Sequence, residues 1–183
     1  MTRTALVIID MQQAMADRIA DGRDCANPEA GTRIAALAAD FRARGLPVLH
    51  VRHHDPDPAS SFHAGKPGAA PLPCDTAAEG EPVFCKSTSS AFASTDLAAY
   101  LKREGIGRLV ITGAVAGFCV TSTVRAASDL GFAVVLPRDA LLGFDLPFEG
   151  ARLPAQTILQ VTLATLGADF ATLTTTEALR AGL

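Results

Sequence analysis

One stretch of the sequence, residues 108–129, constrains the fold more than any other. An apolar, β-branched run at 109–111 enters a turn of small residues at 113–117, and apolar residues at helical spacing follow. This order predicts a buried strand, a tight turn and a helix. Cys119 falls at the junction, where unpaired N–H groups and the positive end of the helix dipole favour a thiolate and can hold an oxyanion. The pattern indicates a reactive thiol; the alternative is a cysteine that packs as a small hydrophobe.

Strand-like and helical patterns alternate along the whole chain. This alternation predicts an α/β fold in which a parallel sheet carries helices on both faces. Residues 56–81 and 141–147 are expected to be loops, and residues 11–26 are expected to be mostly loop with some helical turn. A helix is expected from about 148 to 166, interrupted early by Pro154. The expected strands lie at residues 5–9, 47–51, 82–85, 109–111, 133–136 and 169–173.

Composition restricts the functional classes. With 183 residues, 49% of them hydrophobic and 19% charged, the chain is expected to form one globular domain over residues 1–183. A net charge of −3 without a Lys/Arg cluster argues against nucleic acid as a partner, and no apolar run approaches the roughly 20 residues of a membrane helix. Because no secretory signal is recognised, we expect a cytoplasmic protein with reduced thiols. The cysteines are Cys25, Cys74, Cys85 and Cys119.

Three chemically complementary side chains follow the expected strands. Ligands of such sheets bind beyond the carboxyl ends of the strands, where Asp10, Lys86 and Cys119 fall. Asp10 can accept the thiol proton, Lys86 can stabilise a thiolate, and Cys119 can attack as a nucleophile. Lowering the thiol pKa by about two units needs only ~2.7 kcal/mol, within reach of a close ammonium and a helix terminus. The ordinary alternatives are a turn cap for Asp10 and a solvated Lys86.

Four motifs extend this pattern over nearly the whole chain. They are Leu-Val-Ile-Ile-Asp-Met-Gln ending at Gln12, Lys86 with Ser-Ala-Phe shortly after it, Ile-Thr-Gly followed by Cys119-Val120, and Asp139-Ala140. In this combination the chain resembles the isochorismatase-like cysteine hydrolases, which include nicotinamidases and N-carbamoylsarcosine amidase. The resemblance implies a three-layer fold with six parallel strands in the order 3-2-1-4-5-6. It also implies that Asp10, Lys86 and Cys119 form a catalytic triad.

The resemblance implies a cis peptide bond between Ala114 and Val115. The purpose of this bond would be to aim the N–H of Val115, beside that of Cys119, at a developing oxyanion. Such donors are typically worth ~3 to 4 kcal/mol each when removed. Family members often carry a threonine three residues before the cysteine, where this chain has Ala116. The substrate contacts of residues 116–118 therefore stay open.

Some members of the family hold a divalent metal after the second strand, and the match to their ligands is incomplete here. His53 and Asp55 occupy the first two ligand positions, but Ala59 occupies the third. Two ligands rarely hold a catalytic ion, although His54 or His63 could substitute. We expect no metal and no other cofactor. His53 or His54 is expected instead to line the pocket or to hydrogen-bond the loop.

A small, partly apolar pocket is expected at the same edge of the sheet. Its aromatic lining is expected to come from the loops, with Leu142 or Phe144 as further candidates. The predicted substrate-binding residues are Gln12, His54, Phe62, Phe92 and Phe118.

Cys119 favours hydrolysis of the C–N bond of a small amide or N-carbamoyl compound through a thioester. The alternatives are an isochorismatase-type activity, which cleaves a vinyl ether without a cysteine, a metal-dependent nicotinamidase, and a noncatalytic scaffold of the same fold. No glycine-rich phosphate-binding turn follows the first strand, which argues against a nucleotide-binding scaffold. The resemblance implies a homodimer or homotetramer whose partner is a small-molecule substrate.

Overall fold

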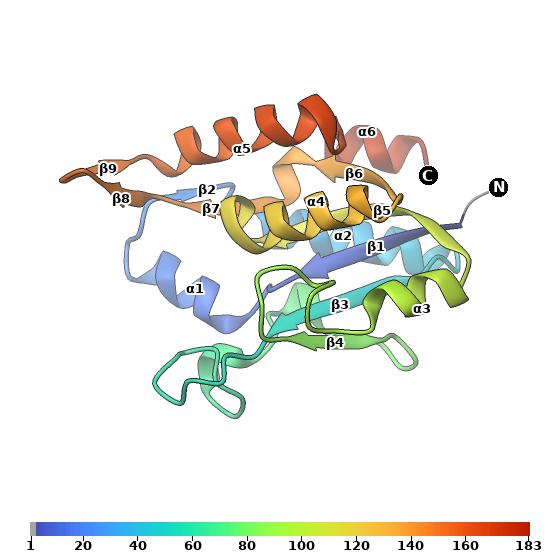
Figure 1. Ribbon diagram of the computed structural model, residues 1–183, viewed down its shortest axis with the longest axis horizontal. Coiled ribbons are helices and arrows are strands. Elements are labelled where there is room, and N and C mark those ends of the chain that lie inside the picture. Colours follow the sequence, from blue (N-terminus) through green and yellow to red (C-terminus); the bar gives the residue numbers. More distant parts are fainter. Residues whose placement is uncertain (1–2) are drawn as a thin grey trace.

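Six parallel strands form the centre of the computed structural model, which describes residues 3–183. They lie in the order β4-β3-β1-β5-β6-β10 across the sheet (Figure 1). Numbered along the chain, this is the order 3-2-1-4-5-6, so the predicted α/β class and strand order are confirmed. The six strands are β1 (Arg3–Ile9), β3 (Val48–His53), β4 (Val83–Lys86), β5 (Ile106–Ala114), β6 (Ala133–Pro137) and β10 (Thr172–Thr174).

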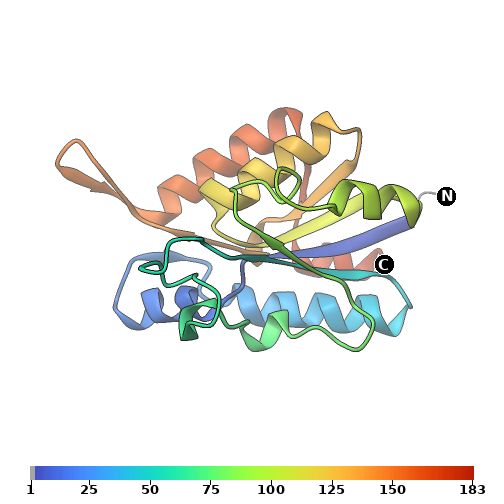
Figure 2. The ribbon, with the colours of Figure 1, turned by 60° about the horizontal axis from the view of Figure 1, so that its bottom comes forward.

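Helices cover both faces of the sheet and make it the middle of three layers (Figure 2). Because both faces are packed, residues 5–9 of β1 are all buried rather than alternately exposed. Leu6 and Ile8 contribute to the core on one face, and Val7 and Ile9 contribute to the core on the other. One face carries α1 (Gln13–Ala20), α2 (Ala30–Ala43) and α6 (Thr176–Ala181); the other carries α3 (Leu97–Arg103), α4 (Thr121–Asp129) and α5 (Ala155–Asp169).

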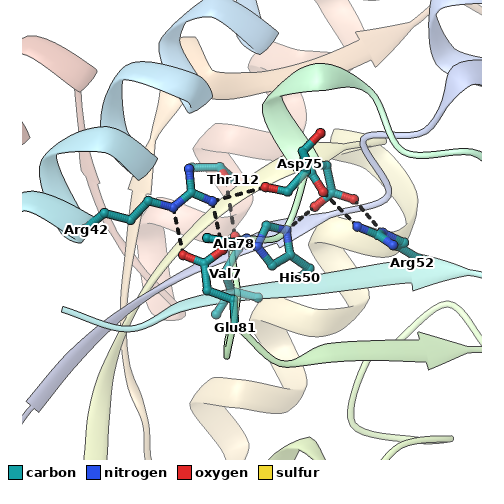
Figure 3. Close-up of polar contacts among 9 residues, drawn as sticks. Val7, Arg42, His50, Arg52, Asp75, Ala78, Glu81 and Thr112 are labelled. Carbon is teal, nitrogen blue, oxygen red and sulfur yellow. Dashed lines mark hydrogen bonds and ion pairs between the residues drawn. The ribbon is translucent and has the colours of Figure 1, made fainter. Parts of the chain in front are cut away.

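The long segment after β3 is irregular, as expected, apart from the single turns η1 (Pro67–Ala69) and η2 (Pro73–Asp75). A network of charged side chains fastens it to the sheet (Figure 3). The buried ring of His50 on β3 lies 2.6 Å from Asp75 and 2.9 Å from Glu81, one carboxylate at each ring nitrogen. Arg52 pairs with Asp75 at 2.9 Å, and Arg42 of α2 pairs with Glu81 at 2.7 Å. These contacts hold the segment against β3 and α2.

The region between β6 and α5 differs from the prediction. The expected loop at 141–147 contains β7 (Leu141–Phe144), which extends the sheet beside β5, and the helix begins at Ala155 rather than near 148. Strands β8 (Leu146–Phe148) and β9 (Ala151–Leu153) form a hairpin that projects from the body (Figure 1). The reason lies in the turn: Glu149 and Gly150 have φ of 48° and 78°, as a two-residue hairpin loop requires.

Residues 11–26, expected to be mostly loop, contain α1 and the short strand β2 (Cys25–Ala26). Strand β2 pairs antiparallel with β7 and so adds a further strand beyond the predicted six. The last turn of α1 and the residues after it therefore lie near β7 and the hairpin. Within residues 3–183, no helix has both the length and the apolar character needed to cross a bilayer.

Candidate active site

The topology brings Asp10, Lys86 and Cys119 together at the carboxyl edge of the sheet. Asp10 is the first residue after β1, and Lys86 is the last residue of β4. Cys119 lies on a π-helical turn, η3 (Ala116–Val120), between β5 and α4. Since β1, β4 and β5 are parallel members of one sheet, their carboxyl ends meet at the same edge.

Lys86 joins the other two side chains. Its Nζ lies 2.8 Å from Asp10 Oδ2 and 3.2 Å from Cys119 Sγ. Lys86 is fully buried and Asp10 is 2% exposed, so a charge on either needs the other. The second carboxylate oxygen of Asp10, Oδ1, is buried and has no hydrogen-bond partner among residues 3–183. A buried acceptor without a partner is suited to receive a proton.

The thiol is protonated in the resting site, contrary to the expectation from sequence. Burial and the negative charge of Asp10 raise the pKa of Cys119 to about 11, although Lys86 acts in the opposite direction. Burial also raises the pKa of Asp10, opposed by Lys86. The expected lowering of the thiol pKa is therefore wrong, because desolvation and the carboxylate together outweigh the ammonium. For Cys119 to act as a nucleophile, its thiol would have to lose this proton as it attacks.

The turn before Cys119 is shaped by close backbone contacts. Gly113 has φ of 112°, and a Cβ there would lie 2.0 Å from the carbonyl oxygen of Ile9, so only glycine fits. The peptide bond between Ala114 and Val115 is cis, as the family resemblance implies. The N–H of Val115 donates to no acceptor in the described part of the chain. Thr121 Oγ1 donates to the carbonyl of Ala116 at 2.7 Å and closes the turn onto α4.

A cavity of about 290 Å³ opens onto the candidate nucleophile. Two of the predicted substrate-binding residues line it: Phe62, which is buried, and Phe118, which is 49% exposed and therefore at its mouth. Phe144, a further candidate, also lines it, whereas Leu142 does not. The full lining is Asp10, Met15, Arg18, Arg23, His53, Phe62, Val115, Phe118, Cys119, Phe144 and Leu146.

Three predicted substrate-binding residues do not line this cavity. The side chain of Gln12 is buried, donates to the carbonyls of His53 and Ala69, and accepts from the His53 N–H, so it ties backbone segments together. Adjacent residues of an extended chain point to opposite sides, so that His53 lines the cavity and His54 does not. Phe92 stacks on a core phenylalanine and packs against the hydrophobic core on the α4 side of the sheet.

The cavity also contains residues that the sequence did not single out: Met15, Arg18, Arg23 and Leu146. Met15 and Arg18 belong to α1, in a segment expected to be mostly loop, and Leu146 belongs to the hairpin. Charged residues in a segment without clear periodicity give little indication of where they point. The pairing of β2 with β7, which carries these segments to the site, is a contact between residues far apart in sequence.

The histidines considered as metal ligands have other contacts. His53 Nδ1 lies 3.4 Å from Lys86 Nζ, and burial together with that ammonium lowers the pKa of His53. His63 Nδ1 lies 3.1 Å from the carbonyl oxygen of Asp55. In the residues that the structure describes, no group of three or more His, Cys, Asp or Glu side chains is arranged to hold a metal ion. His53 lines the cavity, which is one of the two positions expected for it; the other was a hydrogen bond to the loop.

Comparison with known proteins identifies the family. Residues 4–177 match the model of the isochorismatase domain, and the chain therefore belongs to the isochorismatase family of hydrolases. A putative hydrolase of this family from Chromobacterium violaceum superposes with a TM-score of 0.92 at 36% identity, covering 98% of this chain and 92% of that one. The family resemblance and the predicted enzyme class, a hydrolase, are confirmed.

Curated relatives extend this comparison. The chain is 33% identical to an uncharacterized isochorismatase family protein of Bacillus subtilis, YrdC, over 97% of this chain and 94% of that protein. It is 32% identical to N-carbamoylsarcosine amidase of an Arthrobacter species over 117 residues, which are 55% of this chain and 44% of the amidase. The family thus includes a relative named for the hydrolysis of a carbamoyl compound.

Proposed function

We propose that the protein is a cysteine-dependent hydrolase that cleaves the C–N bond of a small amide or N-carbamoyl compound. The observation that carries this proposal is the position of Lys86 Nζ, 2.8 Å from Asp10 Oδ2 and 3.2 Å from Cys119 Sγ. Asp10 and Cys119 also line a cavity of about 290 Å³, large enough for a small molecule only. A base, a cation and a nucleophile in contact beside a cavity are the groups that acyl transfer requires.

The first step forms a tetrahedral intermediate bonded to Cys119. Asp10 takes the proton of the Cys119 thiol while the sulfur attacks the carbonyl carbon of the substrate. The negative charge moves from the carboxylate to the sulfur and on to the substrate oxygen, while Lys86, close to both side chains, stays in place. One buried ammonium can therefore stabilise the charge before and after the proton transfer. This role fits a thiol whose pKa is about 11 at rest.

Backbone donors are proposed to hold the oxyanion of the tetrahedral intermediate. The N–H of Val115 has no acceptor within residues 3–183, and Val115 lines the cavity next to Cys119. The N–H of Cys119 itself is the second proposed donor. Two preorganised donors in a site with little water stabilise developing charge without reorganisation.

Breakdown of the tetrahedral intermediate forms the thioester, which water then hydrolyses. Asp10 returns its proton to the leaving nitrogen as the C–N bond breaks, so that ammonia or an amine departs and the acyl group stays on sulfur. Water then attacks the thioester carbonyl, with Asp10 accepting a proton from it. The C–S bond breaks, the proton returns to the sulfur, and the acid leaves.

A screen for ammonia release tests this proposal. Purified protein is incubated with small amides and N-carbamoyl compounds, and with isochorismate as a substrate of the alternative, vinyl-ether-cleaving type. Release of ammonia, with an acyl adduct on the peptide that contains Cys119 after acid quench, is the expected result. Cleavage of isochorismate without ammonia release from any amide would refute it.

A further inference from the structure

One arginine in the candidate active-site cavity has no anionic partner among the residues that the structure describes. Arg18, in the last turn of α1, lines the cavity, yet in residues 3–183 it takes part in no ion pair. Its guanidinium lies over the rings of Phe62 and Phe144, 5.5 and 5.7 Å from their centroids, and donates only to the sulfur of Met15 at 3.8 Å. A guanidinium carries five N–H donors in a plane, so most of its hydrogen-bonding capacity is unused.

The neighbouring arginine is occupied. Arg23 Nε lies 3.0 Å from Asp145 Oδ1, and its Nη2 lies 2.8 Å from the Asp145 carbonyl oxygen. The other carboxylate oxygen of Asp145 accepts from Arg152 of the hairpin. Asp145 is therefore engaged by two other arginines. Burial and the charge of Arg23 lower the pKa of Arg18, so an anion placed against Arg18 would relieve an unfavourable environment.

Arg18 shares a wall of the cavity with the proposed catalytic cluster. Phe62 contacts the ring of His53 edge to face, with centroids 5.6 Å apart, and the Arg18 guanidinium lies over the same phenyl ring. His53 Nδ1 in turn lies 3.4 Å from Lys86 Nζ. A ligand that lies along Phe62 can thus reach both Cys119 and Arg18. Met15 and Phe144, which also line this region, are apolar, and Arg23 is paired with Asp145.

We infer that Arg18 binds a carboxylate of the substrate, which makes the substrate a short amide or ureido acid with an apolar body. The planar fork of a guanidinium matches both oxygens of a carboxylate, and few other groups in the cavity compete for one. The cavity of about 290 Å³ limits the body to a few carbon atoms or one ring. As a statement about the substrate, this inference rests on the proposed function; carboxylate binding can be measured without turnover.

Pairs of ligands that share one amide and differ only in carrying a carboxylate or a second amide at the other end test the role of Arg18. Glutaramate carries an amide and a carboxylate, and glutaramide carries two amides; succinamate and adipamate, each with its diamide, vary the length. Binding is measured by calorimetry on the Cys119→Ala protein, with and without Arg18→Gln. We expect at least one monoamide acid to bind about tenfold or more tightly than its diamide, and Arg18→Gln to abolish the difference.

Two further variants separate charge from packing. Arg18→Lys keeps the charge and is expected to retain part of the carboxylate preference. Arg18→Met keeps a long apolar side chain without the charge and is expected to lose the preference. Arg103→Gln, a change at an exposed arginine of α3, is the matched control and is expected to change nothing. Arg18→Met also covers the case in which Arg18→Gln does not fold.

The outcomes separate this inference from the proposed function. Equal binding of every acid and its diamide, no binding of any acid, or a preference that survives both Arg18→Gln and Arg18→Met would overturn it. If the wild-type protein hydrolyses neutral amides as fast as it hydrolyses the monoamide acids, the inference fails and the proposed function stands. If the acids bind through Arg18 but wild-type protein releases no ammonia from them or any other amide, the inference stands and the proposed function fails.

Discussion

Lys86 and Cys119 lie 3.2 Å apart at Nζ and Sγ, yet the pKa of the Cys119 thiol is raised to about 11. The ammonium is already neutralised by Asp10 at 2.8 Å, and both charges are buried. The sulfur therefore faces an ion pair in a poorly solvated site rather than a free cation. In this arrangement Asp10 determines whether the thiol keeps its proton.

Asp10→Asn is expected to have opposite effects on turnover and on thiol reactivity. Removal of the carboxylate abolishes the proposed base, and it also removes a charge that raises the pKa of Cys119, while Lys86 remains. With a thiol pKa of about 11, roughly one molecule in ten thousand is a thiolate at pH 7. Alkylation of Cys119 by iodoacetamide at pH 7 should therefore be slow in the wild type and about tenfold or more faster in Asp10→Asn.

Peptide mapping by mass spectrometry follows this reaction residue by residue. The exposed Cys85 serves as the internal control and should label at the same rate in both proteins. Faster labelling of Cys119 in the wild type than in Asp10→Asn would show that the carboxylate promotes the thiolate at rest, against the arrangement described above.

Lys86→Met should destabilise the protein strongly. It leaves the carboxylate of Asp10 buried without a counter-charge, and breaking a buried pair in this way typically costs about 3–5 kcal/mol. The double variant Asp10→Asn with Lys86→Met removes both charges and should be more stable than Lys86→Met alone. Urea denaturation of the wild type, Asp10→Asn, Lys86→Met and the double variant gives the free energies of unfolding. A double variant whose loss equals the sum of the two single losses would mean that the pair is not coupled.

The network around His50 predicts acid sensitivity. Hydrogen bonding to Arg42 lowers the pKa of Glu81 from 4.5 to about 2 in the folded protein. A lowered folded-state pKa adds stability that is fully present above the unfolded value of 4.5 and is lost as the pH falls through about 2. In Glu81→Gln the free energy of unfolding should be lower at pH 7 and fall less steeply between pH 5 and pH 2 (a window set by the two pKa values). The exposed Glu79→Gln is the matched control, and equal acid slopes in the two variants would contradict the prediction.

Gly113→Ala tests the backbone contact that shapes the turn. The added Cβ would lie 2.0 Å from the Ile9 carbonyl oxygen at a φ of 112°, so the change should cost more than about 4 kcal/mol or prevent folding. Gly31→Ala in α2 is the control. Its Cβ would meet nothing closer than 3.6 Å, and alanine favours a helix by up to about 1 kcal/mol. Thermal unfolding of both variants is the measurement, and a Gly113→Ala protein as stable as the wild type would refute the contact.

Local sequence patterns predict six strands of the central sheet and the meeting of Asp10, Lys86 and Cys119. The last strand lies at Thr172–Thr174 rather than at 169–173, because α5 extends to Asp169. Runs of buried β-branched residues identify parallel strands, and the carboxyl ends of such strands share one edge. The strand order and the cis position of Ala114–Val115 came from the family resemblance, since neither is encoded in a local pattern.

The remaining features depend on contacts between distant residues. The helical pattern after residue 148 concealed a hairpin, because a Glu149-Gly150 turn does not stand out beside apolar flanks. Arg18 reaches the cavity through the fold of residues 11–26, which the periodicity did not define. The thiol pKa was predicted in the wrong direction because the extent of burial and the position of Asp10 are three-dimensional quantities.

The steady-state rate of Cys119→Ala on a substrate identified by ammonia release tests the proposed mechanism most directly. Alanine removes the sulfur at a partly buried position and leaves a small gap, so the variant should fold and melt like the wild type. If Cys119 forms the thioester, kcat/KM should fall by at least about a thousandfold, because the atom that attacks the substrate is gone. A folded Cys119→Ala protein that hydrolyses the substrate within a few-fold of the wild-type rate would contradict covalent catalysis by Cys119.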